Sequence, residues 1–400
     1  MYYSITYSNI NICIFRYNKV YFCINRNYPG VYVSDKGKLE TTLKELEEEY
    51  AKTGDDKSTN KYLGKLRSKI ASTKKELIEA SKKQKGKGFF VKKAGDATVA
   101  LLGFPSTGKS SLLNTLTDAG SKTAAYFFTT NNIIPGTLVY KSAHIQLLDM
   151  PGILENAHLG LGGGTTVIAQ LRSADLVVFV VDIRDANQID VLIRELNALD
   201  IYPNRNKPHI QLQQSSQNTG VKIDLNRSGI GAQNIRIVLN SFGTYNATIR
   251  LFEQMSEDEL IANIAGRATY VPALVALNKA DLQKNHDKLA AELSRRHHIE
   301  VIPVSATNNI GIEEFKKSMY DKLGLMTVFL RPRLEKRGSP ITIKQGRSVG
   351  ELAKKLHTEV FNELKCAYVD GPSTKYPNQR VGITHILKEG DIITFIKNKS

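Results

Sequence analysis

The sequence predicts an α/β fold built on a doubly wound, mostly parallel sheet. Short apolar runs of the kind buried on both faces of a sheet alternate with helical stretches, as they do when helices connect parallel strands. The predicted strands are residues 97–102, 145–148, 176–181, 273–277 and 301–304, with helices predicted at 110–116 and 191–199 among them. A glycine-rich turn, Gly103 to Ser110, follows the first strand and opens a helix, which is typical of this fold.

The chain of 400 residues is longer than one ordinary domain, and its charge is unevenly distributed. Its 55 basic and 39 acidic residues give a net charge of +16. Residues 94–323 have a net charge of −1, whereas residues 52–93 have +10 and residues 324–400 have +7. We therefore expect about two to four domains. The two basic blocks indicate an anionic partner that binds outside the central block.

The composition excludes several classes of protein. A hydrophobic content of 41% and a charged content of 24% exclude general disorder and a collagen-like fibre. The three cysteines have no Cys-x-x-Cys pair or histidine cluster beside them, which favours a reducing compartment over a disulfide or zinc framework. No apolar run approaches the ~20 residues of a membrane span. We expect a cytoplasmic protein without a membrane partner.

Two segments precede the central block. Residues 1–34 form an atypical extension, because seven of the seventeen tyrosines lie in the first 33 residues without a clear helical or strand period. Two interpretations stay open: a short β-rich or disordered extension, or translated upstream sequence with the native start near Val31 or Val33. Residues 35–93 predict a basic helical hairpin and linker, since two apolar seams at helical spacing flank a polar turn: Leu39, Leu43, Leu46, Tyr50 and then Leu63, Leu66, Ile70, Leu77.

The α/β core is predicted to cover residues 94–323, with an inserted α+β segment at 204–266. In that segment the alternation of buried strands and helices stops, and we expect strands at 210–213, 221–225, 235–239 and 247–251 and a helix at 256–264. The last segment, residues 324–400, is predicted to form a compact α+β domain. Its expected elements are a strand at 341–343, a helix at 349–364 and strands at 367–369 and 392–396.

The strongest chemical signal is the glycine-rich turn, which matches the P-loop pattern G-x4-G-K-S. Its glycines let backbone amides surround phosphate groups, and the helix that follows adds a favourable field. Lys109 is expected to bridge the β- and γ-phosphates, and the Ser110 hydroxyl to ligate Mg²⁺. The predicted phosphate-binding residues are Gly103, Phe104, Pro105, Ser106, Thr107, Gly108, Lys109, Ser110 and Ser111.

A second pattern, Asp149-Met150-Pro151-Gly152, closes the next predicted strand. An acid at this position can hold Mg²⁺ through water, and the Gly152 amide can sense the γ-phosphate. Between the two patterns, Thr130, or failing that Thr129, is expected to reach Mg²⁺ and the γ-phosphate in the triphosphate-bound state. The predicted catalytic set is therefore Lys109, Thr130 and Gly152, and the predicted metal set is Ser110, Thr130 and Asp149.

A third pattern, Asn278-Lys279-Ala280-Asp281, follows the predicted strand at 273–277. A carboxylate can accept hydrogen bonds from both N1–H and the exocyclic amine of guanine, whereas adenine offers no such pair. Asp281 therefore predicts GTP over ATP as the ligand, and disfavours an ATPase. Ser305 and Ala306, which follow the last core strand, are expected to complete the base pocket with backbone amides.

Together these residues resemble the developmentally regulated GTP-binding proteins (DRG) of the Obg superfamily. The resemblance covers about residues 36–400 and rests on 64–66, 87–93, 95–110, 125–130 with Pro135-Gly136, and 145–152. Residues 367–369, 381–382 and 387–391 look like a TGS domain, which implies a β-grasp fold. The resemblance also implies that the inserted segment is similar to the second domain of ribosomal protein S5. The chain departs from the family at Asn131, at Asn156 and in 159–164, where arginines are absent.

The expected activity is slow GTP hydrolysis to GDP. Many GTPases place a water-orienting Gln after D-x-x-G, but this chain has Ile153, which cannot hydrogen-bond. We expect stimulation by another group, a partner protein or a monovalent cation. Potassium stays open, because related potassium-stimulated enzymes usually have Asn at the position of Ser106. Asp182 and Asp185 are interpreted as ordinary carboxylates at a strand end.

Two functions remain in competition. The first is a GTPase switch that acts on ribosomes or RNA in translation through the two basic flanks. The alternative is a protein-regulated signalling scaffold that binds GTP with little hydrolysis. Salt-sensitive binding to ribosomes separates them, because contacts with phosphate groups weaken steeply as salt rises.

Overall fold

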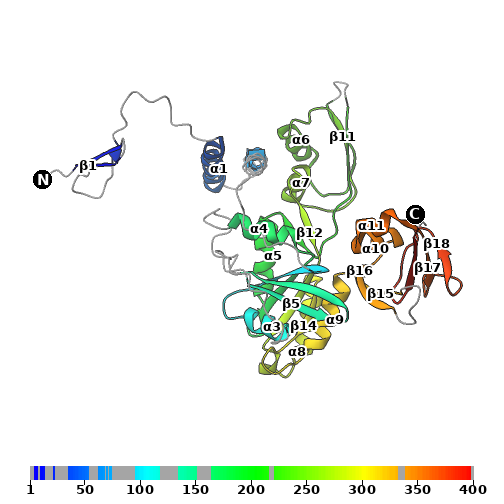
Figure 1. Ribbon diagram of the computed structural model, residues 1–400. Helices are drawn as coiled ribbons and strands as arrows, with labels where there is room; N and C mark the ends of the chain where they lie inside the picture. Colours follow the sequence, from blue (N-terminus) through cyan, green and yellow to red (C-terminus); the bar gives the residue numbers. More distant parts are fainter. Residues whose placement is uncertain are drawn as a thin grey trace. The chain divides into compact units, whose positions relative to one another are not determined.

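The computed structural model describes residues 4–7, 10–13, 21–22, 35–53, 62–67, 69–70, 72–73, 95–117, 134–150, 164–215, 220–331 and 338–397. The chain divides into two compact units, residues 1–85 and 86–400 (Figure 1).

The first unit contains a small sheet and paired helical segments. Strands β1 (Ser4–Tyr7), β2 (Ile10–Cys13) and β3 (Tyr21–Phe22) form an antiparallel sheet within the predicted extension. Helix α1 (Asp35–Lys52) covers the predicted first helix, and residues 62–67 are also helical. Arg67 Nε donates to Tyr50 Oη at 2.7 Å, and its guanidinium lies 5.4 Å from the centre of that ring. These contacts join the two helical segments side by side.

The second unit is built on a six-stranded sheet with the order β14-β13-β7-β4-β6-β5. Five strands are parallel: β4 (Ala97–Leu102), β6 (Ala143–Asp149), β7 (Leu176–Asp182), β13 (Ala273–Asn278) and β14 (Glu300–Pro303). Every residue of β4, β7 and β13 is buried, which explains their continuous apolar sequences. The predicted α/β fold with a mostly parallel sheet is therefore confirmed.

The edge strand β5 (Ile134–Tyr140) is antiparallel and was not predicted from the sequence. Its sequence contains Pro135 and Gly136, which disfavour a strand, and it lies half-exposed at the border of the sheet. A Cβ on Gly136 would come within 2.7 Å of Thr117 Cγ2 and 2.8 Å of Leu113 Cδ1, so these side chains pack closely on the strand. Pairing with β6 along its whole length forms this strand in the folded chain.

Helices cover both faces of the sheet, as a doubly wound fold requires. On one face, α4 (Gly164–Ser173), α5 (Gln188–Ala198) and α8 (His286–His297) pack through Leu171, Leu192 and Leu293. On the other face, α3 (Lys109–Leu116) and α9 (Ile312–Lys322) pack through Leu112 and Phe315. The two apolar clusters meet at the buried strands between them.

A separate three-stranded sheet follows the core strand β7 in sequence. Strands β9 (Ile210–Gln214), β10 (Val221–Asn226) and β11 (Ala247–Leu251) have the order β10-β11-β9, and α7 (Glu257–Ile264) matches the predicted helix. The prediction of a strand at 235–239 is wrong, because these residues belong to α6 (Ala232–Ser241). Ile235, Val238 and Leu239 have helical spacing and are buried, so the short apolar run is one face of a helix.

The chain enters and leaves this segment through two short parallel strands. They are β8 (Ile201–Pro203) and β12 (Thr269–Val271), which pair with one another. Tyr202 and Tyr270 stack at this junction with ring centres 5.2 Å apart. The Tyr270 hydroxyl donates to Oε1 of the buried Glu259 at 3.0 Å, so a polar network fastens α7 to the junction.

The C-terminal sheet has five strands in the order β16-β15-β19-β17-β18. They are β15 (Leu325–Leu330), β16 (Ser339–Lys344), β17 (Leu364–Asp370), β18 (Gln379–Val381) and β19 (Ile392–Lys397). The single helix expected at 349–364 is wrong. It is replaced by α10 (Val349–Leu356) and α11 (Thr358–Asn362), because His357 between them has extended backbone angles, and Leu364 begins a strand.

Polar contacts join this sheet and helix α10 to the amino-terminal ends of the core strands. Lys355 Nζ contacts Asp96 Oδ1 at 2.5 Å, just before β4, and the Ser142 hydroxyl lies 2.9 Å from that of Thr342.

No helix in the described parts of the chain is long and apolar enough to cross a membrane.

Candidate nucleotide-binding site

The predicted nucleotide-binding residues gather at the carboxyl ends of the parallel strands. β4 leads into the glycine-rich turn, β6 ends at Asp149 and β13 ends at Asn278. Ser305 and Ala306 follow β14 by a few residues. Parallel strands bring these ends to one edge of the sheet, which is where doubly wound folds bind ligands.

Two glycines of the P-loop are required by close packing. A Cβ on Gly103 would lie 2.2 Å from the Val180 carbonyl oxygen. Gly108, the residue before α3, has a left-handed φ of 89°, and a Cβ there would lie 2.3 Å from Asn278 Nδ2. The turn therefore folds tightly against both neighbouring strand ends.

The side chains of the P-loop stabilise its curved backbone. Lys109 Nζ donates to the carbonyl oxygens of Gly103 at 2.8 Å and Phe104 at 2.9 Å. The buried Thr107 hydroxyl also donates to the Phe104 oxygen, at 2.9 Å. Burial lowers the pKa of Lys109, and the nearby Asp149 carboxylate opposes that shift. The lysine ammonium thus lies in the middle of the loop, where phosphate oxygens can replace the carbonyls as its acceptors.

The rest of the predicted phosphate-binding set is placed around this loop. The partly buried Phe104 packs against the core. The exposed members are Pro105, Ser106, Ser110 and Ser111.

Ser110 and Asp149 form the pair expected to hold a metal ion. The Ser110 hydroxyl donates to Asp149 Oδ2 at 2.8 Å, and Asp149 is only 6% exposed. A hydroxyl and a carboxylate are oxygen ligands of the kind that Mg²⁺ prefers, so the residues fit this ion. The other predicted residues of the γ-phosphate side, Thr130 (or Thr129) and Gly152, lie outside the described residues.

On the base side, Asn278 connects three loops. Its Nδ2 donates to the Thr107 carbonyl at 2.8 Å, and its Oδ1 accepts a long hydrogen bond of 3.4 Å from the Ala306 amide. Asp281, in the short 3-10 helix η3 (Ala280–Leu282), is exposed and able to meet a base. The Ser305 amide, in contrast, already donates to the Ile310 carbonyl at 3.0 Å. Of the two amides expected in the base pocket, that of Ala306 is the less firmly engaged.

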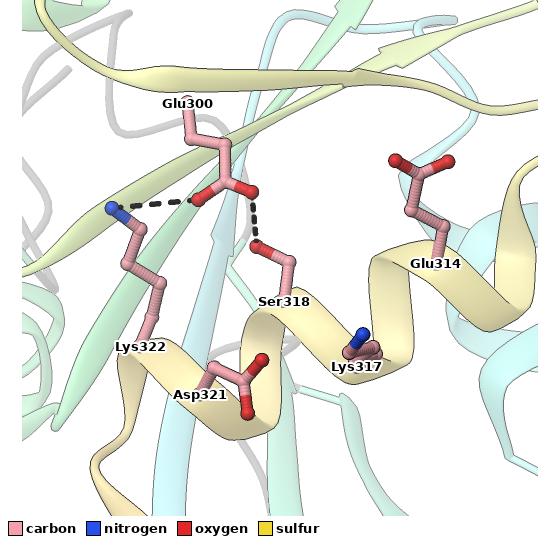
Figure 2. Close-up of a pocket in the computed structure, with 6 residues that line it drawn as sticks. All are labelled: Glu300, Glu314, Lys317, Ser318, Asp321 and Lys322. Atoms are coloured by element: carbon pink, nitrogen blue, oxygen red, sulfur yellow. Dashed lines mark hydrogen bonds and ion pairs between the residues drawn. The ribbon is translucent and has the colours of Figure 1, made fainter.

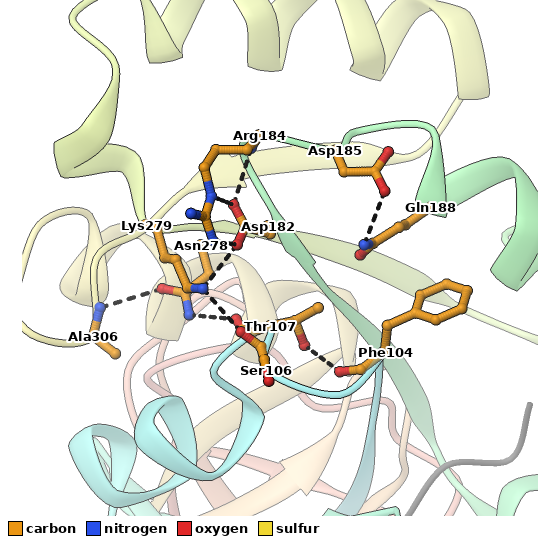
Figure 3. Close-up of polar contacts among 10 residues, drawn as sticks. All are labelled: Phe104, Ser106, Thr107, Asp182, Arg184, Asp185, Gln188, Asn278, Lys279 and Ala306. Carbon is orange, nitrogen blue, oxygen red and sulfur yellow. Dashed lines mark hydrogen bonds and ion pairs between the residues drawn. The ribbon is translucent and has the colours of Figure 1, made fainter.

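Asp182, which ends β7 and was interpreted from the sequence as an ordinary strand-end carboxylate, contacts a residue of the Asn-Lys-x-Asp turn. Figure 3 shows its carboxylate between Arg184 and Lys279, with Oδ2 2.8 Å from Lys279 Nζ. Its neighbour Asp185 accepts a hydrogen bond from Gln188 at 3.2 Å. An acidic residue that ends the strand next to β13, with Arg two positions later, is the signal that could have singled out Asp182.

A hollow of about 400 Å³ beside α9 lies apart from these motifs (Figure 2). Its lining residues are Glu300, Glu314, Lys317, Ser318, Asp321 and Lys322. Glu300 already accepts from Ser318 at 2.8 Å and pairs with Lys322 at 3.5 Å. In the part of the chain that the structure describes, no three His, Cys, Asp or Glu side chains gather as a metal site.

A P-loop lysine and serine, a buried acid at the end of the adjacent strand, and an Asn-Lys-x-Asp turn define a P-loop GTPase fold and site. Family models agree: residues 98–214 match the 50S ribosome-binding GTPase family, 218–325 match the C-terminal region of that family's domain, and 330–397 match the TGS domain. The chain belongs to the developmentally regulated GTP-binding protein family, and it is a GTP-binding protein.

The relatives match almost the whole chain. An uncharacterized GTP-binding protein of Methanocaldococcus jannaschii is 36% identical over 377 residues, which cover 93% of this chain and 96% of that protein. Human developmentally-regulated GTP-binding protein 2 is 34% identical over 364 residues, covering 89% and 98%. Among solved structures, the Schizosaccharomyces pombe YchF GTPase is 16% identical with a TM-score of 0.42, covering 77% of this chain and 99% of that one.

Proposed function

We propose that this protein hydrolyses GTP slowly, as a partner- or cation-stimulated switch that acts on ribosomes or RNA in the cytoplasm. One observation supports the chemistry above all others. A single edge of the sheet holds the P-loop Lys109, the Ser110–Asp149 pair and, on the base side, Asp281. This arrangement supplies groups for the phosphates, for a magnesium ion and for guanine.

Each residue has a defined task in this proposal. Lys109 exchanges its two backbone acceptors for phosphate oxygens and orients the β- and γ-phosphates. Ser110 and Asp149 hold Mg²⁺, which offsets the negative charge of the phosphates when bound. Asp281 accepts from the guanine N1–H and amine, which excludes adenine. Thr130 and Gly152 are assigned to the γ-phosphate from the sequence alone.

Slow hydrolysis follows from the residue that succeeds the D-x-x-G pattern. Ile153 has no polar atom with which to orient the attacking water. The missing group is proposed to come from a partner protein or from a potassium ion. Single-turnover hydrolysis in potassium and in sodium buffers, with and without ribosomes, tests this. Fast turnover of the isolated protein in sodium buffer would contradict the proposal.

The magnesium assignment has its own test. Ser110→Ala and Asp149→Asn should each weaken the dependence of GDP affinity on Mg²⁺, because each removes an oxygen that fits the ion. Ser241→Ala, in α6 of the segment with the separate three-stranded sheet, is a control. This variant should retain the magnesium dependence of GDP affinity. Fluorescent GDP titrated at several Mg²⁺ concentrations provides a readout that does not depend on turnover. Unchanged magnesium dependence in both site variants contradicts the assignment.

The proposed anionic partner is supported by charge. Residues 52–93 have a net charge of +10 and residues 324–400 have +7. In the C-terminal domain, Lys344 of β16 and Lys355 of α10 already pair with carboxylates of the core. Lys375, Arg380 and Lys388 remain exposed to a partner. The description of the matching family as ribosome-binding points to the ribosome as the source of the phosphate groups. The free, buried Cys366 fits a reducing cytoplasm.

Co-sedimentation with ribosomes, in GDP or in a non-hydrolysable GTP analogue and over a range of salt, tests the partner. Binding should depend on the nucleotide and fall steeply with salt. Deletion of either basic flank should weaken it. The alternative, a signalling scaffold that holds GTP with little hydrolysis, is favoured by Ile153. It predicts stoichiometric bound GTP and no sedimentation with ribosomes, and that outcome would replace our first proposal.

A further inference from the structure

Asp182 occupies a special position in the sheet. Its strand β7 lies between β4, which leads into the P-loop, and β13, which leads into the Asn-Lys-x-Asp turn. In the register of the parallel pair, Asp182 stands beside Asn278. Its side chain is 10% exposed. A buried carboxylate is therefore placed between the phosphate-binding and base-binding loops.

This carboxylate accepts hydrogen bonds from two cationic side chains and one backbone amide. Asp182 Oδ1 accepts from the Arg184 amide at 3.0 Å and from its Nε at 2.9 Å. Oδ2 accepts from Arg184 Nη2 at 2.5 Å and from Lys279 Nζ at 2.8 Å. The hydrogen bonds from Arg184 are the main reason why the pKa of Asp182 is well below its usual range, while burial acts in the opposite direction. The carboxylate is therefore ionised at neutral pH and its direction is fixed by the guanidinium.

Lys279 connects Asp182 to the P-loop. Its Nζ also donates to the Ser106 carbonyl at 2.9 Å. Ser106 and Lys279 both have a φ of 63°, a left-handed backbone conformation that costs free energy for a residue with a Cβ. The Lys279 ammonium thus joins its own turn to the P-loop and to the end of β7, and Lys279 and Ser106 are both strained residues (Figure 3).

We propose that Asp182 is a positioning residue for guanine nucleotides: it orients Lys279 and, through it, holds the base-binding turn in register with the P-loop. A nucleotide contacts both loops at once, so their relative placement before binding determines how much of the binding free energy is lost to ordering. Asp182 itself touches neither phosphate nor base in this proposal. It should affect nucleotide affinity and leave the rate of hydrolysis from the bound state unchanged.

The test uses Asp182→Asn in the full-length protein, with Asp185→Asn as the matched control. Asn keeps the size of the side chain and one acceptor but removes the charge. Asp185 lies three residues away and accepts from Gln188. The affinity of fluorescent GDP and GTP should fall at least about tenfold in Asp182→Asn, as expected for a charge-assisted hydrogen bond. The single-turnover rate at saturating GTP should stay unchanged, and Asp185→Asn should match the unmodified protein.

A double-mutant cycle separates positioning from a general structural effect. Lys279→Met keeps the apolar stem and removes the ammonium. If Asp182 acts through Lys279, then Asp182→Asn combined with Lys279→Met binds GDP as Lys279→Met does alone. Additive losses, or unchanged GDP affinity in Asp182→Asn, overturn the inference. Arg184→Ala leaves the Asp182 carboxylate in place but removes the guanidinium that orients it. This variant should lose part of the GDP affinity.

This inference rests on GTP binding, and the same measurements distinguish the two failures. If the unmodified protein fails to bind GTP, the proposed function fails. If it binds GTP and Asp182→Asn binds equally well, only the role of Asp182 fails. Thermal unfolding of each variant without nucleotide establishes whether it is folded.

Discussion

Lys344 Nζ lies 2.8 Å from Asp175 Oδ1, and the other oxygen of the same carboxylate accepts a hydrogen bond of 3.0 Å from the Thr98 amide. One acidic residue thus joins the C-terminal sheet to the start of β7 and of β4. The other end of β4 leads into the P-loop, and the other end of β7 is Asp182. The contact therefore lies at the end of the core sheet opposite the candidate site.

The two partners of this contact should contribute unequally to stability. Asp175→Asn should lower the free energy of unfolding by about 1–3 kcal/mol, because it removes the charged acceptor of a backbone amide. Lys344→Met should lower it by less than about 1 kcal/mol, since the lysine is 43% exposed and screened by solvent. Urea unfolding of both variants measures the difference. Equal losses would show that the ion pair, and not the hydrogen bond to Thr98, dominates.

Gly108→Ala should abolish nucleotide binding. The new Cβ would meet Asn278 Nδ2 at 2.3 Å in a backbone with a φ of 89°. Gly243→Ala is the matched control, because Gly243 has a φ of 75° and open space around its Cβ position. Both changes have the conformational cost of about 1–2 kcal/mol, but only the first displaces Asn278. Titration with fluorescent GDP should show binding in the control and none in Gly108→Ala.

Asp281→Asn should change the preferred base from guanine to xanthine. The amide of Asn offers a donor where the carboxylate offers only acceptors, so it mismatches the guanine amine and matches the carbonyl of xanthine at the same position. GTP affinity should fall about a hundredfold or more and XTP affinity should rise. Competition between the two nucleotides measures this. If the variant still prefers GTP, a group other than Asp281 determines which base is bound.

The pH dependence of stability should reveal the tyrosine pair at β8 and β12. Burial raises the pKa of Tyr270 to about 12, and it also raises the pKa of Tyr202. A phenol with a raised pKa in the folded state stabilises the fold below pH 10, and this contribution is lost as the pH rises from about 10 towards 12. Tyr270→Phe should therefore lose less stability across this window than the unmodified chain.

Urea unfolding at several alkaline pH values measures that loss directly. Tyrosinate absorbance gives a second readout, and it is not obscured by tryptophan because the chain has none. Equal pH dependence in Tyr270→Phe and the unmodified protein contradicts the assignment.

Much of the core could be predicted from local patterns. Strands β4, β7 and β13 are buried on both faces, so their sequences are continuously apolar and easily recognised. Residues 235–239 were misassigned because a short apolar run has the same composition in a strand and on one face of a helix. β5 was missed because its Pro135 and Gly136 disfavour a strand, although the segment pairs with the adjacent β6. No strand was predicted at β15, which pairs with β16 and β19.

The sequence by itself determined the identity of the nucleotide-binding groups. The predictions for Gly103 and Gly108 rest on the backbone geometry of one short turn, those for Lys109 and Ser110 on the side chains that this turn carries, and that for Asp281 on the chemistry of its own carboxylate. Only the tertiary structure decided how these groups are held. Lys279 lies 97 residues from Asp182 along the chain, and no local pattern links them. The parallel pairing of β7 with β13 brings them together, because it places both strand ends at one edge of the sheet.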